Sequence, residues 1–217
     1  MPFLSTTSRD IPLVRERAAL LFVDVQNFCC RRDGGEFAGM SPAEIEEKYG
    51  YFFERLETLA IPNMQRLQAG FRAAGIEVMY TTIESLTRDG RDRSLDYKIT
   101  GFNVPKGSWD GKVIDALAPG EDEIVLPKSS SSVFVSTHID YVLRNLDVAQ
   151  LVICGCLTDQ CVESAVRDAC DLGYLVTLVP DACATYSEAR HQNSLAEIKG
   201  YCRQVPTEAL LAEIGQG

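Results

Sequence analysis

The sequence predicts an α/β fold in which helices cover both faces of a parallel β-sheet. Apolar runs alternate along the chain with stretches of helical pattern, and this alternation is typical of strand–helix–strand units. The first run, residues 18–23, is apolar without interruption, as expected of a strand that is buried on both faces. With 217 residues, the chain has a length suited to one sizeable domain, residues 1–217.

In the first half of the chain, local signals place a helix and a second strand after the strand at 18–23. Ser41 is a favourable N-cap followed by a proline and an acidic first turn, so we expect a helix over residues 42–74, with a break near Pro62. A glycine ends this helix, and the run at 76–82 predicts a strand. Residues 84–109 are polar and irregular, and loops of this length in compact domains are usually functional or disordered.

In the second half, apolar runs bounded by prolines, glycines and polar turns indicate four further strands with helices between them. The helix that begins at Thr158 has a well-placed C-terminal glycine, Gly173. The expected strands are 123–126, 151–154, 174–179 and 201–205, and the expected helices are 114–117, 137–146, 158–172, 187–199 and 207–214.

Composition and charge exclude several classes of protein. Apolar residues make up 46% and charged residues 24% of the chain, which is ordinary for a globular protein. No apolar run reaches the length of a membrane span and no signal peptide is evident, so we expect a cytoplasmic protein with no membrane partner. The net charge of −10 argues against a nucleic-acid partner. The absence of glycine-rich phosphate loops argues against a nucleotide enzyme.

The eight cysteines do not form a disulfide or metal-binding pattern. No Cys-x2-Cys pair is present, and the two histidines, His138 and His191, stand apart. Without a secretory signal, reduced thiols are expected, most of them as small core residues. The sequence therefore predicts no metal and no cofactor.

Three reactive side chains follow the ends of predicted strands: Asp24, Lys128 and Cys161. In a parallel sheet these ends lie at one edge, where ligands bind, so the three can converge. Cys161 sits where a helix begins, and a helix N-terminus lowers the pKa of a thiol and stabilises an anion. An aspartate can take the thiol proton, and a lysine can stabilise both anions.

Each of these residues alone has a simpler interpretation. Cys161 can be a buried core thiol, Asp24 a turn cap and Lys128 an ordinary surface lysine. Their joint placement at strand ends is what favours a cysteine hydrolase.

The segments around these residues resemble the three signatures of the isochorismatase-like cysteine hydrolase superfamily. They are Val-Asp-Val-Gln-Asn at 23–27, Leu-Pro-Lys at 126–128 and Gly-Cys-Leu-Thr-Asp-Gln-Cys-Val at 155–162, and residues 179–184 resemble the strand end that usually follows. The resemblance spans residues 18–205. It implies a three-layer α/β/α sandwich with a mostly parallel six-stranded sheet, assembled as a homodimer or homotetramer.

By this resemblance, Cys161 is the nucleophile, Asp24 the proton shuttle and Lys128 the electrostatic partner. The family carries a cis peptide that corresponds to the bond between Cys156 and Leu157. The amides of Leu157 and Cys161 would then form the oxyanion hole.

Features that differ between branches of the superfamily favour carbon–nitrogen bond hydrolysis. Nicotinamidases hold a metal with histidines in the loop after the second strand, and residues 83–109 contain no histidine. Isochorismatases, which cleave a vinyl ether, do not depend on a cysteine at the position of Cys161. Residues 105–110 and 124–128 resemble ureidoacrylate amidohydrolases most closely, with biuret hydrolase and N-carbamoylsarcosine amidohydrolase as related branches.

Four residues are candidates for substrate binding. Gln26 lies in the first signature, Glu84 can bond a urea N–H directly after a strand, and Trp109 can wall the pocket. Arg88 is one of three nearby loop arginines that could clamp a carboxylate, and pairing with aspartates of the same loop is an equally good interpretation. Cys29 lies where relatives often carry an aromatic residue, which weakens the transfer of any one substrate.

The sequence thus predicts a metal-independent cysteine amidohydrolase that acts on a small ureido, carbamoyl or amide compound through a thioester. An isochorismate-type ether hydrolase with an incidental Cys161 is one alternative. A non-catalytic thiol-sensing or binding protein is the other, and the proximity of Cys154, Cys156 and Cys161 in sequence motivates it.

Overall fold

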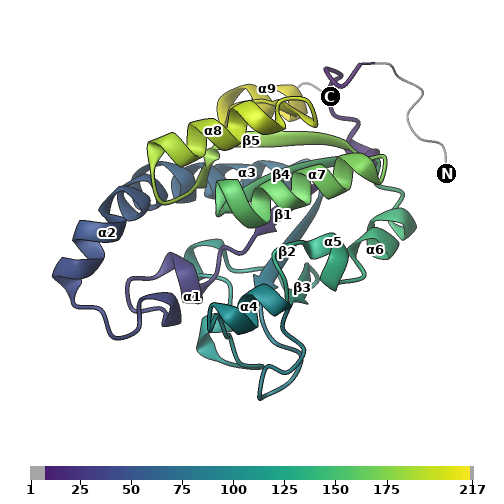
Figure 1. Cartoon of the computed structure of the whole chain (residues 1–217). Helices are drawn as coiled ribbons and strands as arrows, with labels where there is room; N and C mark the ends of the chain where they lie inside the picture. Colours follow the sequence, from purple (N-terminus) through teal and green to yellow (C-terminus); the bar gives the residue numbers. More distant parts are fainter. Residues whose placement is uncertain (1–7, 216–217) are drawn as a thin grey trace.

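The computed structural model describes residues 8–215 and contains a central six-stranded sheet (Figure 1). The strand order is β3-β2-β1-β4-β5-β6, and every neighbouring pair is parallel. The expectation of a six-stranded sheet is confirmed, and the sheet is parallel throughout rather than mostly. The strands are β1 (Ala18–Val23), β2 (Glu77–Ile83), β3 (Ile124–Lys128), β4 (Gln150–Cys156), β5 (Leu175–Ala184) and β6 (Cys202–Gln204).

Helices cover both faces of this sheet (Figure 1). Helices α3 and α9 pack together over one face, whereas α7 lies on the opposite face beside α5 and α8. Because right-handed crossovers from β1 to β2 and from β4 to β5 run in opposite directions along the sheet, they place their helices on opposite faces. The helices are α1 (Asn27–Cys30), α2 (Pro42–Arg55), α3 (Ile61–Ala73), α4 (Leu95–Ile99), α5 (Val133–Ser136), α6 (Ile139–Asn145), α7 (Glu163–Asp171), α8 (Glu188–Ile198) and α9 (Thr207–Gly215).

The long helix predicted over 42–74 is present but is interrupted by one π-helical turn. Its start is fixed by a capping box, in which the Ser41 hydroxyl accepts from the Glu44 amide and the Glu44 carboxylate accepts from the Ser41 amide. The π-helical turn spans Leu56–Ala60 and ends two residues before Pro62, close to the expected break. Proline has no N–H to donate one turn back, so a widened turn at this place keeps the helix continuous.

Two strands run past the prolines at which they were expected to end. β3 continues through Pro127 to Lys128, and it is an edge strand, where a missing N–H is tolerated. β5 continues to Ala184 because Pro180 lies in an irregularity, where the pairing register with β4 shifts. The short helices α1, α4 and α5 were not expected, since each is too short to show a periodic pattern.

The carboxyl ends of β1 and β4 meet closely at Gly155. Its φ of +128° disfavours other residues, and a Cβ there would lie 2.2 Å from the Val23 carbonyl oxygen. All residues of β1 are buried, as predicted for a central strand. Within residues 8–215, no helix is both long and apolar enough to cross a membrane.

Candidate active site

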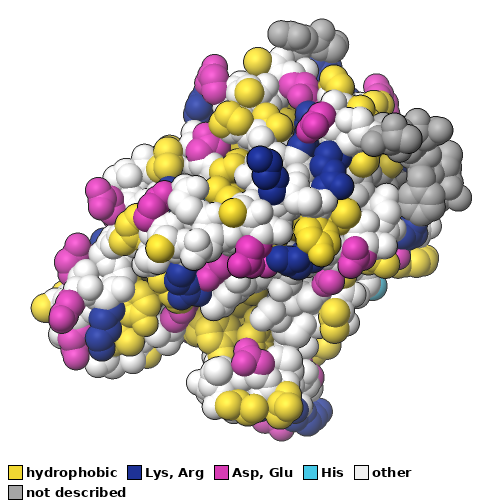
Figure 2. Space-filling model, turned by 45° about the horizontal axis from the view of Figure 1, so that its top comes forward, with side chains coloured by type: hydrophobic (Ala, Val, Ile, Leu, Met, Phe, Trp, Pro, Cys, Tyr) yellow, Lys and Arg dark blue, Asp and Glu magenta, His cyan; other side chains and the backbone are white. Residues whose placement is uncertain are grey.

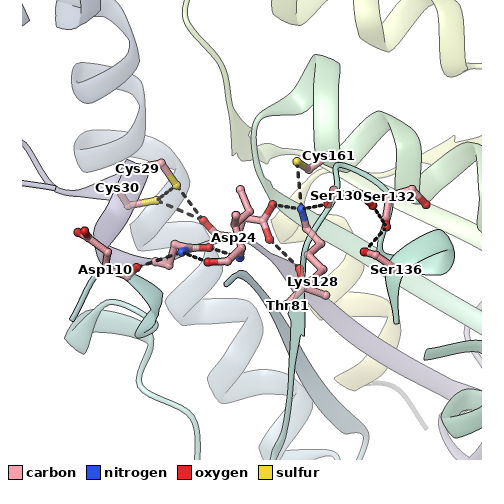
Figure 3. A network of polar contacts seen from close by, with 12 residues as sticks. Asp24, Cys29, Cys30, Thr81, Asp110, Lys128, Ser130, Ser132, Ser136 and Cys161 are labelled. Carbon is pink, nitrogen blue, oxygen red and sulfur yellow. Dashed lines mark hydrogen bonds and ion pairs between the residues drawn. The ribbon is translucent and has the colours of Figure 1, made fainter. Parts of the chain in front are cut away.

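Asp24, Lys128 and Cys161 converge at the carboxyl edge of the sheet (Figure 3). Asp24 follows β1, Lys128 ends β3, and Cys161 lies in a π-helical turn, Thr158–Val162, that leads into α7. The Lys128 Nζ atom is 2.8 Å from Asp24 Oδ2 and 3.3 Å from Cys161 Sγ. It also donates to the Ser130 carbonyl at 2.9 Å, so its three hydrogens are all directed to acceptors.

The backbone and one threonine hold Asp24 in place. Its φ of +54° turns the chain sharply out of β1, and its amide donates to the Thr81 carbonyl at 3.0 Å. The Thr81 hydroxyl donates to Asp24 Oδ1 at 3.0 Å, which leaves Oδ2 for Lys128. Asp24 and Lys128 are 1% and 0% exposed, so this ion pair is shielded from solvent screening.

Burial has the largest effect on the pKa values of the Cys161 thiol and of Asp24. Burial raises the pKa of the Cys161 thiol to about 12, although the Lys128 charge opposes the rise. Burial also raises the pKa of Asp24 against the lowering effect of Lys128. For Lys128, the negative charges of Asp24 and Cys161 outweigh burial and raise its pKa. The expectation of a lowered thiol pKa is therefore wrong, because desolvation of the thiolate dominates.

The turn that carries Cys161 is anchored to α8 and α2. The peptide bond between Cys156 and Leu157 is cis, as the sequence resemblance implied. Thr158 Oγ1 lies 2.9 Å from Nδ1 of His191, whose Nε2 lies 2.8 Å from Nη2 of Arg55. A guanidinium can only donate, so Nε2 must accept and Nδ1 must carry the ring proton. Sequence reasoning missed this chain of contacts, because it joins three elements that are distant along the sequence.

A cavity of about 320 Å³ opens in front of Cys161. In the space-filling view, hydrophobic side chains line a hollow between the main body and the lobe that carries α4 (Figure 2). Tyr97 of α4 contributes a buried hydroxyl that has no hydrogen-bond partner in the described part of the chain. Burial raises the pKa of this hydroxyl, and the nearby Ser131 only partly opposes the rise. The lining residues are Asp24, Cys29, Glu36, Ile83, Asp96, Tyr97, Thr100, Phe102, Ser131, Cys156, Leu157, Gln160, Cys161 and Tyr186.

The four residues predicted to bind substrate do not line this cavity. Gln26 is fully buried, and its amide group bonds the Ile83 backbone and the Asp110 carbonyl. Glu84 accepts from the Gly107 amide at 2.6 Å. The two remaining candidates lie on the surface: Trp109 is 46% exposed and Arg88 lines a separate shallow pocket.

The acidic residues of the 84–109 loop order that loop. Asp92 accepts from the amides of Leu86 and Thr87, and Asp89 pairs with Arg91 at 2.9 Å. These contacts support the structural interpretation of the loop charges over a carboxylate clamp.

Cys29 lines the cavity. This is the position at which relatives often carry an aromatic residue. The Cys29 thiol donates to the Asp24 carbonyl at 3.2 Å. Over residues 8–215, no three His, Cys, Asp or Glu side chains are grouped as a metal site requires.

Comparisons with known proteins find relatives over most of the chain. A protein-family model described as the isochorismatase domain matches residues 18–209. Ureidoacrylate amidohydrolase RutB of Rhizobium rhizogenes is 27% identical over 230 residues, covering 92% of this chain and 89% of that protein. RutB of Agrobacterium fabrum is 29% identical over 188 residues, covering 79% of this chain and 78% of that protein.

Solved structures share the whole fold. A cysteine hydrolase from Pseudomonas syringae pv. phaseolicola matches with a TM-score of 0.80 at 25% identity, over 98% of this chain and 99% of that chain. N-carbamoylsarcosine amidase from Thermoplasma acidophilum matches with a TM-score of 0.67 at 23% identity, over 88% of this chain and 97% of that chain. At the latter identity, the likeness speaks to the fold alone.

Proposed function

Since the chain belongs to the isochorismatase-like cysteine hydrolase family, we propose that it is a metal-independent amidohydrolase. Its substrate is a small ureido, carbamoyl or amide compound, and the bond cleaved is a carbon–nitrogen bond. The observation that carries this proposal is the buried Lys128 ammonium, which lies within bonding distance of both Asp24 and Cys161 beside an open cavity.

In the first half of the reaction, Asp24 removes the proton from the Cys161 thiol as the sulfur attacks the substrate carbonyl carbon. The high pKa of the thiol favours this concerted transfer over a preformed thiolate, and the Asp24 carboxylate lies within hydrogen-bonding reach of the thiol. The negative charge that forms on the carbonyl oxygen is taken by the amides of Leu157 and Cys161. Collapse of this intermediate breaks the C–N bond, and the leaving nitrogen takes the proton from Asp24.

In the second half, water hydrolyses the thioester. Asp24 accepts a proton from the water as its oxygen attacks the carbonyl carbon, and the same amides hold the oxyanion. The C–S bond breaks, and the sulfur takes back the proton from Asp24. Lys128 stays protonated throughout, because its pKa is raised by the charges of Asp24 and Cys161. Its positive charge stabilises negative charge on Asp24 or on Cys161.

The test is ammonia release from a panel of ureidoacrylate, biuret, N-carbamoyl amino acids, nicotinamide and simple amides. Wild type, Cys161→Ala and Cys170→Ala are compared with and without a chelator; Cys170 is a partly exposed thiol of α7 that does not line the cavity. We expect chelator-insensitive release that is lost in Cys161→Ala and kept in Cys170→Ala. Release that survives Cys161→Ala, or that a chelator abolishes, would contradict the proposal.

The two alternatives predict different outcomes. An ether hydrolase with an incidental Cys161 would keep its turnover in Cys161→Ala. A thiol sensor requires an exposed thiol of low pKa, whereas Cys161 is 6% exposed and its pKa is raised.

A further inference from the structure

The cavity contains carboxylates that the proposed reaction does not use. Glu36 and Asp96 both line it, and neither forms a hydrogen bond or ion pair with Asp24, Lys128 or Cys161. Asp96 is exposed on α4, whereas Glu36 is partly buried. Glu36 can therefore contact the part of a substrate that is not the scissile group.

Glu36 is held rigidly by an aromatic cluster. Its carboxylate accepts a hydrogen bond from the Tyr186 hydroxyl. The Tyr186 ring packs edge-on against Tyr49 at 5.1 Å, and Phe37, next to Glu36, packs edge-on against the same Tyr49 ring. A carboxylate fixed in this way is a preorganised recognition group rather than a mobile surface side chain.

No arginine or lysine lines the cavity in the described part of the chain. The Lys128 ammonium is occupied by Asp24, Cys161 and the Ser130 carbonyl. Arg190 lies over the Tyr186 ring, but its guanidinium is paired with Asp159 at 2.5 Å. A substrate carboxylate would therefore meet like charge on the wall without a compensating cation.

The geometry points to a substrate that carries no carboxylate and that directs a cationic or N–H-donating end group to Glu36. This inference rests on the proposed amidohydrolase function and adds the substrate class to it. The volume of about 320 Å³ restricts the substrate to a small molecule.

The protonation of Glu36 fits this role. Burial raises its pKa to about 7, and the bond from Tyr186 only partly opposes the rise. A cationic group bound beside the carboxylate would favour its ionised form. Discrimination against carboxylates is therefore best measured at pH 8, where Glu36 is mostly ionised before any substrate binds.

The experiment compares three ureas of similar size at pH 8: (2-aminoethyl)urea, which is cationic, propylurea, which is neutral, and N-carbamoyl-β-alanine, which is anionic. We expect kcat/KM for the cationic urea to exceed that for the anionic one by about tenfold or more. Glu36→Gln keeps an acceptor for Tyr186 and should lower kcat/KM for the cationic urea by about tenfold, with propylurea changed by less than about threefold. The matched control is Glu47→Gln, on the exposed surface of α2, which should change none of the three.

The outcomes separate this inference from the proposed function. Cysteine-dependent hydrolysis with the anionic urea preferred, or a kcat/KM for the cationic urea that Glu36→Gln leaves unchanged, would overturn the inference without contradicting the amidohydrolase function. If no urea is hydrolysed, the proposed function fails for ureas. The inference is then tested separately, by measuring the binding of the three ureas to Cys161→Ser by calorimetry. Tighter binding of (2-aminoethyl)urea than of N-carbamoyl-β-alanine would support the inference, and the reverse order or no binding of the cation would overturn it.

Discussion

Replacing Lys128 with methionine should destabilise the protein in a pH-dependent manner. Methionine fills much of the same volume but removes the ammonium that lies 2.8 Å from Asp24 Oδ2. Because Asp24 is 1% exposed, its charge would then be buried without a partner. Breaking a buried pair in this way costs roughly 3–5 kcal/mol. For a chain of this length, that loss lowers the Tm by roughly 6–20 °C.

The pH dependence follows from how Asp24 can respond. Without Lys128, the factor that opposes burial is lost, so the folded-state pKa of Asp24 rises further above its unfolded value. An acid whose pKa is raised in the folded state is protonated more readily there, so folding becomes less favourable as pH rises. We expect the destabilisation of Lys128→Met, measured by urea unfolding, to be larger at pH 8 than at pH 5.5.

A second substitution tests the cause. Asp24→Asn in the Lys128→Met background removes the unpaired charge, so it should recover at least about 1–2 kcal/mol while activity stays absent. The control is Lys48→Met on the exposed surface of α2. Equal stability of wild type and Lys128→Met at both pH values, or no recovery in the double variant, would refute the reasoning.

Three further predictions concern residues around the site. His191 has a pKa lowered to about 4 by burial and by Arg55; because the folded value lies below the ordinary one, stability present above pH 6.5 is lost as pH falls towards 4. By urea unfolding, His191→Gln should remove ~2 kcal/mol of the difference between pH 7 and pH 5. Gly155→Ala places a Cβ 2.2 Å from a carbonyl oxygen at a φ of +128°, so it should cost at least ~3 kcal/mol in urea unfolding, whereas Gly200→Ala, with open space around it, should not. Tyr97→Phe removes a buried hydroxyl without a partner, so we expect unfolding stability within ~0.5 kcal/mol of wild type and a kcat/KM lower by about tenfold.

Each of these predictions has a result that would contradict it. A pH dependence of stability that is unchanged in His191→Gln would mean that this imidazole is not the titrating group. Equal stability of the Gly155 and Gly200 variants would mean that β1 and β4 can separate locally at little cost. A large loss of stability in Tyr97→Phe would indicate that its hydroxyl is bonded within the protein and does not face the substrate.

Sequence reasoning predicted that the three candidate catalytic residues lie together, because a general rule of parallel sheets applies to them. Strand ends can be read from apolar runs, and in such sheets these ends share one edge. Asp24, Lys128 and Cys161 each follow a readable run, so their convergence could be predicted. The cis bond and the oxyanion amides came from family resemblance and not from this rule.

The walls of the cavity could not be predicted in the same way. Gln26 was predicted to bind the substrate, but its side-chain amide bonds the backbone of Ile83 and the carbonyl of Asp110 instead. Buried backbone groups need such partners, and this need is not visible in the sequence. Glu36 lines the cavity from a loop whose carboxylate and rings contact Tyr186 and Tyr49, residues that are distant in the sequence. The pKa of Cys161 was predicted from a local rule, whereas burial, a property of the whole fold, decides it.

The order of strands in the sheet has a consequence for synthesis of the protein. β1 emerges first from the ribosome, but one of its two neighbours, β4, begins at Gln150. Until that strand emerges, β1 has an open edge of apolar residues, which is the kind of surface that chaperones protect. The anchor at His191 arrives later still, so the thiol of a nascent chain cannot yet be held for catalysis. Activity therefore appears only when nearly the whole chain has been made, and C-terminal truncations that remove α8 should yield an inactive product.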